Sequence, residues 1–149
     1  MTYTLVRLLH FAAMILWLGG GFSLPPVRDV RRSLALGREE GARLVARLET
    51  ITRLVVPAAV VTVLSGLLLV WMRGGFAAVP PRIHAGLALT LSIFAVGGLG
   101  SRPAIRDLGE GFAAGDNGRA EEAARRFVRW VRVEDALRFT TLALMVVPL

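Results

Sequence analysis

Four long apolar stretches constrain this chain more than any other feature of its sequence. They cover approximately Tyr3–Leu24, Leu54–Met72, Ile83–Gly100 and Val131–Leu149, and hydrophobic residues fill 54% of the 149 positions. A membrane-spanning helix needs about 20 predominantly apolar residues, so the chain has room for four. Only helices and closed barrels satisfy every backbone polar group in lipid, and the short alternating segments of a barrel are absent. We therefore expect one all-α domain over residues 1–149, an integral membrane four-helix bundle.

Arginines are distributed unevenly between these stretches. All 18 basic residues are arginine; seven lie between the first two stretches and seven from Arg102 to Arg132, at the start of the fourth, whereas the middle connection has only Arg73 and Arg82. By the positive-inside rule, the two long segments are cytoplasmic. We expect a multi-pass protein of a bacterial-type inner (plasma) membrane with both termini outward. In this setting the net charge of +7 indicates contact with anionic lipids of the bilayer rather than with nucleic acid.

The cytoplasmic segments are amphipathic, and their apolar stripes have helical spacing. We expect the stripes to extend the second and fourth membrane helices beyond the bilayer and to pack on each other. Binding of a partner protein or of anionic headgroups is the alternative. The first stripe comprises Leu44, Val45, Leu48 and Ile51, and the second Ala123, Ala124, Phe127, Val128 and Val131.

Short patterns recur in the two halves of the chain. Residues 26–30 (PVRDV) are matched by residues 104–108 (AIRDL), and residues 39–43 (EEGAR) by residues 121–125 (EEAAR). We predict two repeated helical hairpins, residues 1–73 and 80–149, related by a pseudo-twofold axis along the membrane normal, as in parallel repeats. Such an axis places the two histidines of the chain at comparable depth.

These histidines, His10 and His84, each lie near the start of an apolar stretch. An ionisable group at such a position is a functional-site hypothesis, because burying it unpaired in hydrocarbon costs several kcal/mol. Two imidazoles on different helices suit axial ligation of haem b and, with further ligands, a copper or other metal site. The alternative is two separate interfacial groups, each bonded to backbone or water. The absence of cysteine excludes thiolate ligands.

Neighbouring residues bear on this choice. Arg7, Arg73 and Arg82 lie near the outer helix ends, where they could pair with haem propionates or anchor the helices by snorkelling. Small residues below His84 leave room for a flat macrocycle or for close helix packing. The face of His10 continues with Met14, Trp17 and Gly21, and the face of His84 with Ala88, Ser92 and Ala95.

Methionines near the same level favour the metal alternative. Thioether and imidazole ligands together suit Cu(I), so His10, His84 and Met14 are the candidate metal ligands. Met72 and Met145 lie in the same outer half, although methionine in an apolar helix is most often a packing residue.

A second polar cluster interrupts the fourth apolar stretch. Glu134 and Arg138 are four residues apart, and Asp135 and Arg138 three, which are the spacings of ion pairs on a helix. Charges at this depth should face the interior of the bundle. We interpret them as a structural pair near the inner surface, with a proton path as the alternative.

The residues Arg7–His10, followed by Trp17–Gly20, resemble the first helix of CopD-like copper-resistance proteins and of the related HemJ-type protoporphyrinogen oxidases. Pro81–His84 is similar to their second histidine region, and Glu134–Pro148 to their last helix. The HemJ resemblance implies haem b bound by His10 and oxidation of protoporphyrinogen, but the lysine of that pattern is Gly86 here. The CopD resemblance implies copper uptake or handling at the periplasmic side.

We therefore expect a membrane b-type haem protein of electron transfer or redox chemistry, with His10 and His84 as axial ligands. The alternatives are a CopD-like copper-binding or uptake protein and an accessory membrane subunit that docks a partner. A homo-oligomer or a partner membrane subunit fits these hypotheses, and enzymatic activity is left open.

Overall fold

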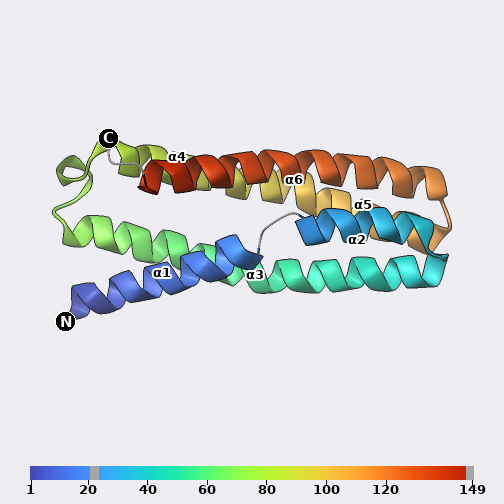
Figure 1. Cartoon of the computed structure of the whole chain (residues 1–149), viewed down its shortest axis with the longest axis horizontal. Helices are drawn as coiled ribbons and strands as arrows, with labels where there is room; N and C mark the ends of the chain where they lie inside the picture. Colours follow the sequence, from blue (N-terminus) through green and yellow to red (C-terminus); the bar gives the residue numbers. More distant parts are fainter. Residues whose placement is uncertain (21–23, 147–149) are drawn as a thin grey trace.

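The computed structural model describes residues 1–20 and 24–146, and their regular structure is entirely helical. Figure 1 shows an elongated molecule in which α3 and α6 run along most of its length. A 3₁₀ turn, η1 (Phe76–Ala78), precedes α4, and a π-helical turn, η2 (Gly97–Ser101), joins α4 to α5. The α-helices are α1 (Thr2–Gly20), α2 (Leu24–Ala35), α3 (Arg38–Met72), α4 (Pro81–Val96), α5 (Arg102–Ala114) and α6 (Asn117–Val146).

Three helical segments of the described chain are long and apolar enough to cross a membrane. They are Thr2–Gly19, Arg38–Met72 and Pro81–Ala114, the last of which runs through α4, η2 and α5. Each of the first three predicted stretches thus contains a helix that could cross a membrane by length and composition, but the first helix ends at Gly20, and Leu24 belongs to α2. The fourth prediction falls on α6, which does not meet this criterion because charged residues interrupt it. Its last residues, including Pro148, lie outside the described residues.

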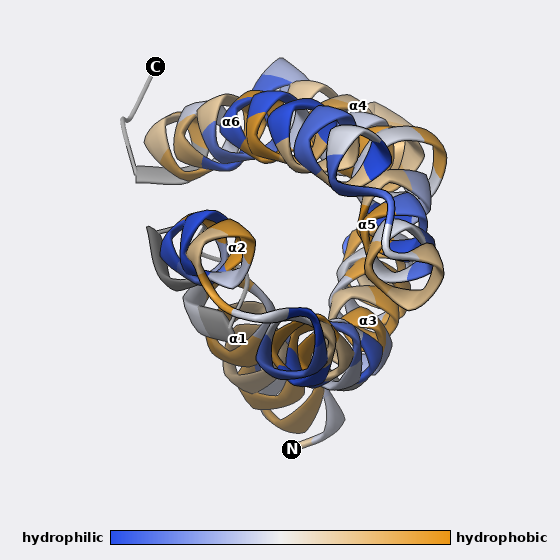
Figure 2. Cartoon of the chain, turned by 90° about the vertical axis from the view of Figure 1, so that its right-hand side faces the viewer, coloured by the Kyte–Doolittle hydropathy of each residue, from blue (hydrophilic) through white to orange (hydrophobic). Residues whose placement is uncertain are grey.

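Two halves follow each other along the long axis of the molecule, one apolar and the other rich in arginine. The apolar half contains α1, α4 and the C-terminal parts of α3 and α6, whereas α2, α5 and the N-terminal parts of α3 and α6 form the arginine-rich half. Figure 2 views the molecule from the arginine-rich end, where hydrophilic residues face the viewer and the hydrophobic helix α1 lies behind. At 1.5 Å per residue, the 35 residues of α3 span about 50 Å and exceed a hydrocarbon core of about 30 Å.

Both halves of the chain contain an apolar helix, a shorter amphipathic helix and a long helix, in that order. The matched sequences at residues 26–30 and 104–108 fall in α2 and α5, and those at residues 39–43 and 121–125 fall near the starts of α3 and α6. The hairpin boundaries and their symmetry nevertheless stay a prediction.

The core of the arginine-rich half combines the two predicted apolar stripes. Val45 and Leu48 of α3 belong to one cluster with Ala123, Phe127 and Val131 of α6. Helices α2 and α5 contact both α3 and α6, so the predicted stripes share a core rather than packing mainly on each other. Helices α2 and α5 complete this core with Val30, Ile105, Leu108 and Phe112. Such close packing is the main source of helix stability in a bundle.

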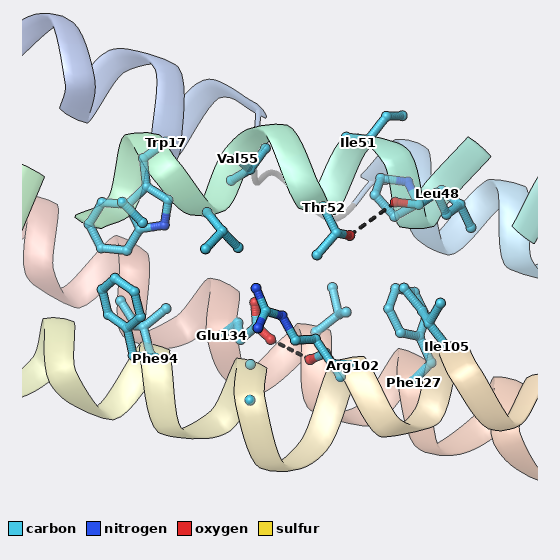
Figure 3. Close-up of a pocket in the computed structure, with 18 of the residues that line it drawn as sticks. Trp17, Leu48, Ile51, Thr52, Val55, Phe94, Arg102, Ile105, Phe127 and Glu134 are labelled. Carbon is cyan, nitrogen blue, oxygen red and sulfur yellow. Dashed lines mark hydrogen bonds between the residues drawn. The ribbon is translucent and has the colours of Figure 1, made fainter. Parts of the chain in front are cut away.

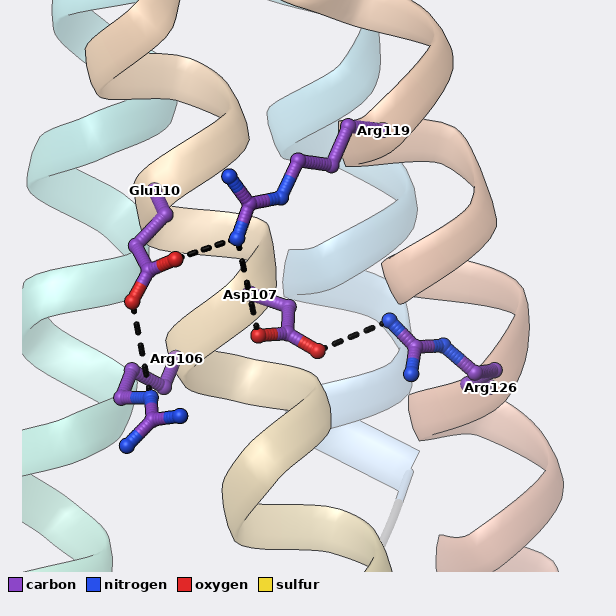
Figure 4. Close-up of polar contacts among 5 residues, drawn as sticks. All are labelled: Arg106, Asp107, Glu110, Arg119 and Arg126. Carbon is purple, nitrogen blue, oxygen red and sulfur yellow. Dashed lines mark hydrogen bonds and ion pairs between the residues drawn. The ribbon is translucent and has the colours of Figure 1, made fainter.

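Charged side chains join α5 to α6 beside this core (Figure 4). Asp107 accepts a hydrogen bond from Arg126 at 2.8 Å and lies 3.8 Å from the guanidinium of Arg119. Arg119 also bonds Glu110, which lies 3.5 Å from Arg106 one turn away. Most of these side chains are partly exposed to solvent, so the network orients the two helices more than it stabilises them.

Two glycines permit close packing where α4, α5 and α6 meet. A Cβ atom at Gly100 in η2 would lie 2.5 Å from the ring of Trp130, and one at Gly111 would lie 2.8 Å from the backbone nitrogen of Ala120. Gly115 adopts a φ of 71° and ends α5, a conformation that favours glycine because it has no Cβ. A side chain at Gly100 or Gly111 would therefore block the close approach of the Trp130 ring or of the Ala120 backbone.

Candidate functional site

His10 lines a cavity of about 290 Å³ between α1, α3, α4 and α6 in the apolar half. Trp17 and Ile93 lie at its deep end, and Tyr3 and Arg73 come from the helix ends near the N-terminus. Five glycine or threonine residues also line it: Thr62, Gly66, Gly86, Thr90 and Thr141. We call this space the histidine cavity.

The imidazole of His10 is held by α3. Its Nδ1 lies 2.9 Å from the carbonyl oxygen of Thr62 and 3.1 Å from Oγ of Ser65. A carbonyl oxygen can only accept, so Nδ1 carries the proton in this hydrogen bond. The hydroxyl of Ser65 donates to the carbonyl of Val61 at 2.6 Å and accepts from the same Nδ1. In the neutral ring this tautomer leaves the lone pair on Nε2, as in histidines that ligate metals.

Gly66 provides the space for this ring. A Cβ atom at Gly66 would lie 3.1 Å from Cε1 and 3.6 Å from Nδ1 of His10. Any larger residue would therefore push the imidazole away from its hydrogen-bond partners. One turn of α3, from Thr62 to Gly66, thus fixes both the tautomer and the position of His10.

The charged residues that line the histidine cavity are all basic. Arg7, Arg73 and Arg82 contribute to its walls, and no aspartate or glutamate is among the described residues that line it. Arg73 donates from Nε to the hydroxyl of Tyr3 at 2.9 Å, and the guanidinium of Arg7 lies 5.6 Å from the ring centroid of Phe11. These contacts orient two of the three cations around one space. The arrangement attracts an anion rather than a cation.

His84 does not share the surroundings of His10. Its side chain is exposed, its ring centroid is 5.7 Å from that of Phe76, and it is absent from the lining of the histidine cavity. The buried stripe of α4 consists of Gly86, Thr90 and Ile93. His84 precedes Gly86 by two residues, or about 200° around the helix, so it points away from that stripe. Ala88, Ser92 and Ala95, which share its face, are exposed as well.

The predicted face of His10 turns inward, in contrast to that of His84. Met14 and Trp17 line the histidine cavity with His10, whereas Gly21 lies outside the described residues. Met72 does not line this cavity, and the side chain of Met145 is outside the described residues. Within residues 1–20 and 24–146, no group of three or more His, Cys, Asp or Glu side chains could hold a metal ion.

A second cavity, of about 180 Å³, continues toward the arginine-rich half (Figure 3). Glu134 and Arg138 line it together with aromatic and aliphatic side chains, and we call it the Glu134 cavity. Trp17 and Ile93 line both cavities, so these side chains lie between them. The rings of Trp17 and Phe94 stack with their centroids 6.1 Å apart.

The ion pairs of the fourth apolar stretch form as predicted. Arg138 donates to Glu134 at 2.7 Å and to Asp135 at 3.2 Å. Glu134 and Arg138 are 7% and 6% exposed, which confirms that they face the interior. Ser101 of η2 donates a hydrogen bond to the other oxygen of Glu134. Sequence reasoning missed Ser101 as well as Thr62, Ser65 and Gly66, because no motif marks a hydroxyl or glycine on a neighbouring helix.

No family model, curated protein or solved structure matches this chain. The resemblance to CopD-like and HemJ-type proteins therefore stays an expectation that rests on the motifs around His10 and His84.

Proposed function

We propose that this chain is an integral membrane protein that binds haem b in the histidine cavity and uses it in electron transfer or redox chemistry. In this proposal the membrane part is a four-helix bundle of α1, α4 and the C-terminal parts of α3 and α6. The observation that carries the proposal is one cavity that combines a tautomer-fixed imidazole with three arginines and, among its described lining residues, no acidic side chain.

The donor set fits the chemistry of haem b. The Nε2 atom of His10 offers a neutral nitrogen ligand, and hydrogen bonding at Nδ1 increases its basicity. Arg7, Arg73 and Arg82 offer guanidinium groups for two propionates. Apolar side chains such as Met14, Leu67 and Leu87 line the rest and suit a macrocycle edge. The cavity volume is near the lower end of the range of small-molecule pockets.

Bound haem would supply a one-electron couple between ferrous and ferric iron. The residues of this chain would set its potential and its orientation. Thr62 and Ser65 hold His10 in one tautomer, the arginines fix the anionic edge toward one membrane surface, and Trp17 and Ile93 close the deep end. His84 as the second axial ligand stays a prediction that its exposed position does not favour.

The proposal includes the orientation of the protein in the membrane. Seven arginines in each long segment, against two in the middle connection, favour outward termini, with the histidine cavity near the outer surface of a bacterial-type inner membrane. The arginine-rich half would then project into the cytoplasm. It offers amphipathic helices to a partner subunit or a second copy.

An absorption spectrum of the purified protein tests the haem proposal. We expect a Soret band and, after reduction, an α-band when the protein is purified from haem-replete cells. A colourless protein that also fails to take up haem on reconstitution would remove the proposal.

Copper binding is the second candidate, since Met14 lies one turn from His10 and lines the same cavity. It predicts retention of Cu(I) that falls in a His10→Ala/Met14→Ala double variant and needs no porphyrin. Equal copper content in both proteins would contradict it. The three arginines favour haem, because their charge repels a metal cation.

A further inference from the structure

The Glu134 cavity is adjacent to the histidine cavity, but its chemistry is different. Glu134 and Arg138 form a buried ion pair at 2.7 Å, and the third charged residue of the lining, Arg102, is exposed, whereas the charged residues described in the lining of the histidine cavity are all basic. A full charge brought beside a compensated buried pair would be poorly stabilised. The Glu134 cavity therefore favours a neutral ligand.

The size and walls of this cavity favour a single ring. Its volume is about 180 Å³, and an apolar protein cavity of about 150 Å³ is enough to bind benzene. Trp17, Phe94 and Phe127 contribute aromatic walls, and Val55 and Ile105 contribute aliphatic ones (Figure 3). Flat rings pack well against such surfaces.

One edge of the cavity is polar. Each oxygen of the Glu134 carboxylate accepts one hydrogen bond within the protein, from Ser101 or Arg138. A carboxylate oxygen has two lone pairs, so Glu134 retains acceptor capacity for a ligand hydroxyl. The guanidinium of Arg102, which also lines the cavity, can donate to a ligand carbonyl. The hydroxyl oxygen of Thr52, which donates to the carbonyl of Leu48 at 3.0 Å, lines the opposite wall. A hydrocarbon tail would use none of these groups.

We propose that the Glu134 cavity binds a neutral, lipid-soluble six-membered ring with hydroxyl or carbonyl groups on its edge, the chemical class of quinols and quinones. The membrane supplies such molecules from its apolar interior, and this site does not depend on haem in the histidine cavity. The ring would lie between α3 and the wall of α4, η2 and α6, with its polar edge toward Glu134 and Arg102.

Trp17 is a built-in reporter for this ligand, because it is 5% exposed and lines the cavity. A Trp71→Phe/Trp130→Phe protein leaves it as the sole tryptophan. We expect decylubiquinone, a benzoquinone with a ten-carbon tail, to quench its fluorescence saturably at one equivalent in detergent. Quenching that rises linearly without saturation would overturn the proposal.

Two threonines of α3 form a matched pair for locating the ligand. Thr52 lines the Glu134 cavity and Thr50 is exposed, yet each donates to the carbonyl four residues before it at 3.0 Å. In the reporter protein, Thr52→Phe should weaken decylubiquinone binding at least tenfold and Thr50→Phe less than twofold. Equal affinities would place the quinone elsewhere, including the histidine cavity that Trp17 also lines, and would contradict the proposal.

A competition experiment with decane distinguishes a site for rings from a site for lipid tails, and it needs no substitution in the cavity. Decane has the tail but no ring, so an excess should leave the quenching by decylubiquinone unchanged. Displacement of the quinone by decane would identify a site for lipid tails and overturn the proposal, even if Thr52→Phe does not fold.

Discussion

The imidazole of His10 donates from Nδ1 to the backbone carbonyl of Thr62, at a distance of 2.9 Å. This hydrogen bond joins α1 to α3 across 52 residues of sequence. It uses a backbone acceptor, so no side-chain substitution at position 62 removes it directly. The consequence is a histidine whose second nitrogen is available for a ligand in the cavity.

Gly66→Ala should disturb this arrangement. The added Cβ would lie 3.1 Å from Cε1 of His10, so the ring has to shift by a few tenths of an ångström and its hydrogen bond to Thr62 weakens. Loss of such a supporting contact typically costs 10- to 100-fold in metal affinity, so we expect haem affinity to fall about tenfold or more. Haem titration followed by absorption measures this. Gly19→Ala is the matched control, since nothing lies within 4 Å of its Cβ; equal losses in both variants would contradict the supporting role of Gly66.

Removing the three cations of the histidine cavity should weaken binding of the propionates. In an Arg7→Gln/Arg73→Gln/Arg82→Gln protein we expect at least tenfold lower affinity for haem, because charge-assisted hydrogen bonds are lost. The dimethyl ester of haem lacks the carboxylates, and its affinity should change less than threefold between the two proteins. Arg31→Gln, an exposed position in α2, serves as control. An equal loss for haem and its ester would indicate damage to the fold rather than loss of propionate partners.

The buried pair of Glu134 and Arg138 should contribute far more to stability than an exposed pair of the same spacing. Arg138→Ala leaves the Glu134 carboxylate buried without its guanidinium, which costs about 3–5 kcal/mol of unfolding free energy in comparable sites. Arg43, which bonds Glu39 at 2.5 Å on the surface of α3, is the matched control, and Arg43→Ala should cost about 0.5 kcal/mol or less. Unfolding in mixed micelles by denaturing detergent compares the two. Similar losses would show that burial does not distinguish these pairs.

Topology can be tested apart from function. Ala78 and Ala113 are exposed and lie near opposite ends of the molecule, in η1 and at the end of α5. With outward termini, a cysteine introduced by Ala78→Cys should react with a membrane-impermeant maleimide in intact cells. Ala113→Cys should react only after permeabilisation. The chain has no cysteine of its own, so the background is low. The reverse pattern would place the histidine cavity at the cytoplasmic surface.

Features that arise from periodicity and spacing along one helix could be predicted from the sequence. The stripes around Val45 and Phe127, the inward face of Met14 and Trp17, and the ion pairs of Arg138 are all confirmed. Each depends on residues three, four or seven positions apart, which a helix brings to one side.

Relations between helices could not be predicted in this way. The exposed position of His84 depends on the rotation of α4, which is set by the buried residues Gly86, Thr90 and Ile93. Gly86 and Thr90 are small or weakly polar. They therefore give no hydrophobic pattern in the sequence that would mark this side of α4 as the inner face. The partners of His10 on α3 likewise depend on a helix contact between distant segments.

The most direct test of the central claim is a titration of purified protein with haem, comparing His10→Ala with His84→Ala. Both variants lose one imidazole, but only His10 lines the cavity that has the three arginines. We predict that His10→Ala abolishes the Soret shift or weakens binding at least a hundredfold, whereas His84→Ala binds haem within about threefold of the unmodified protein. Equal binding by the unmodified protein and His10→Ala would contradict the account.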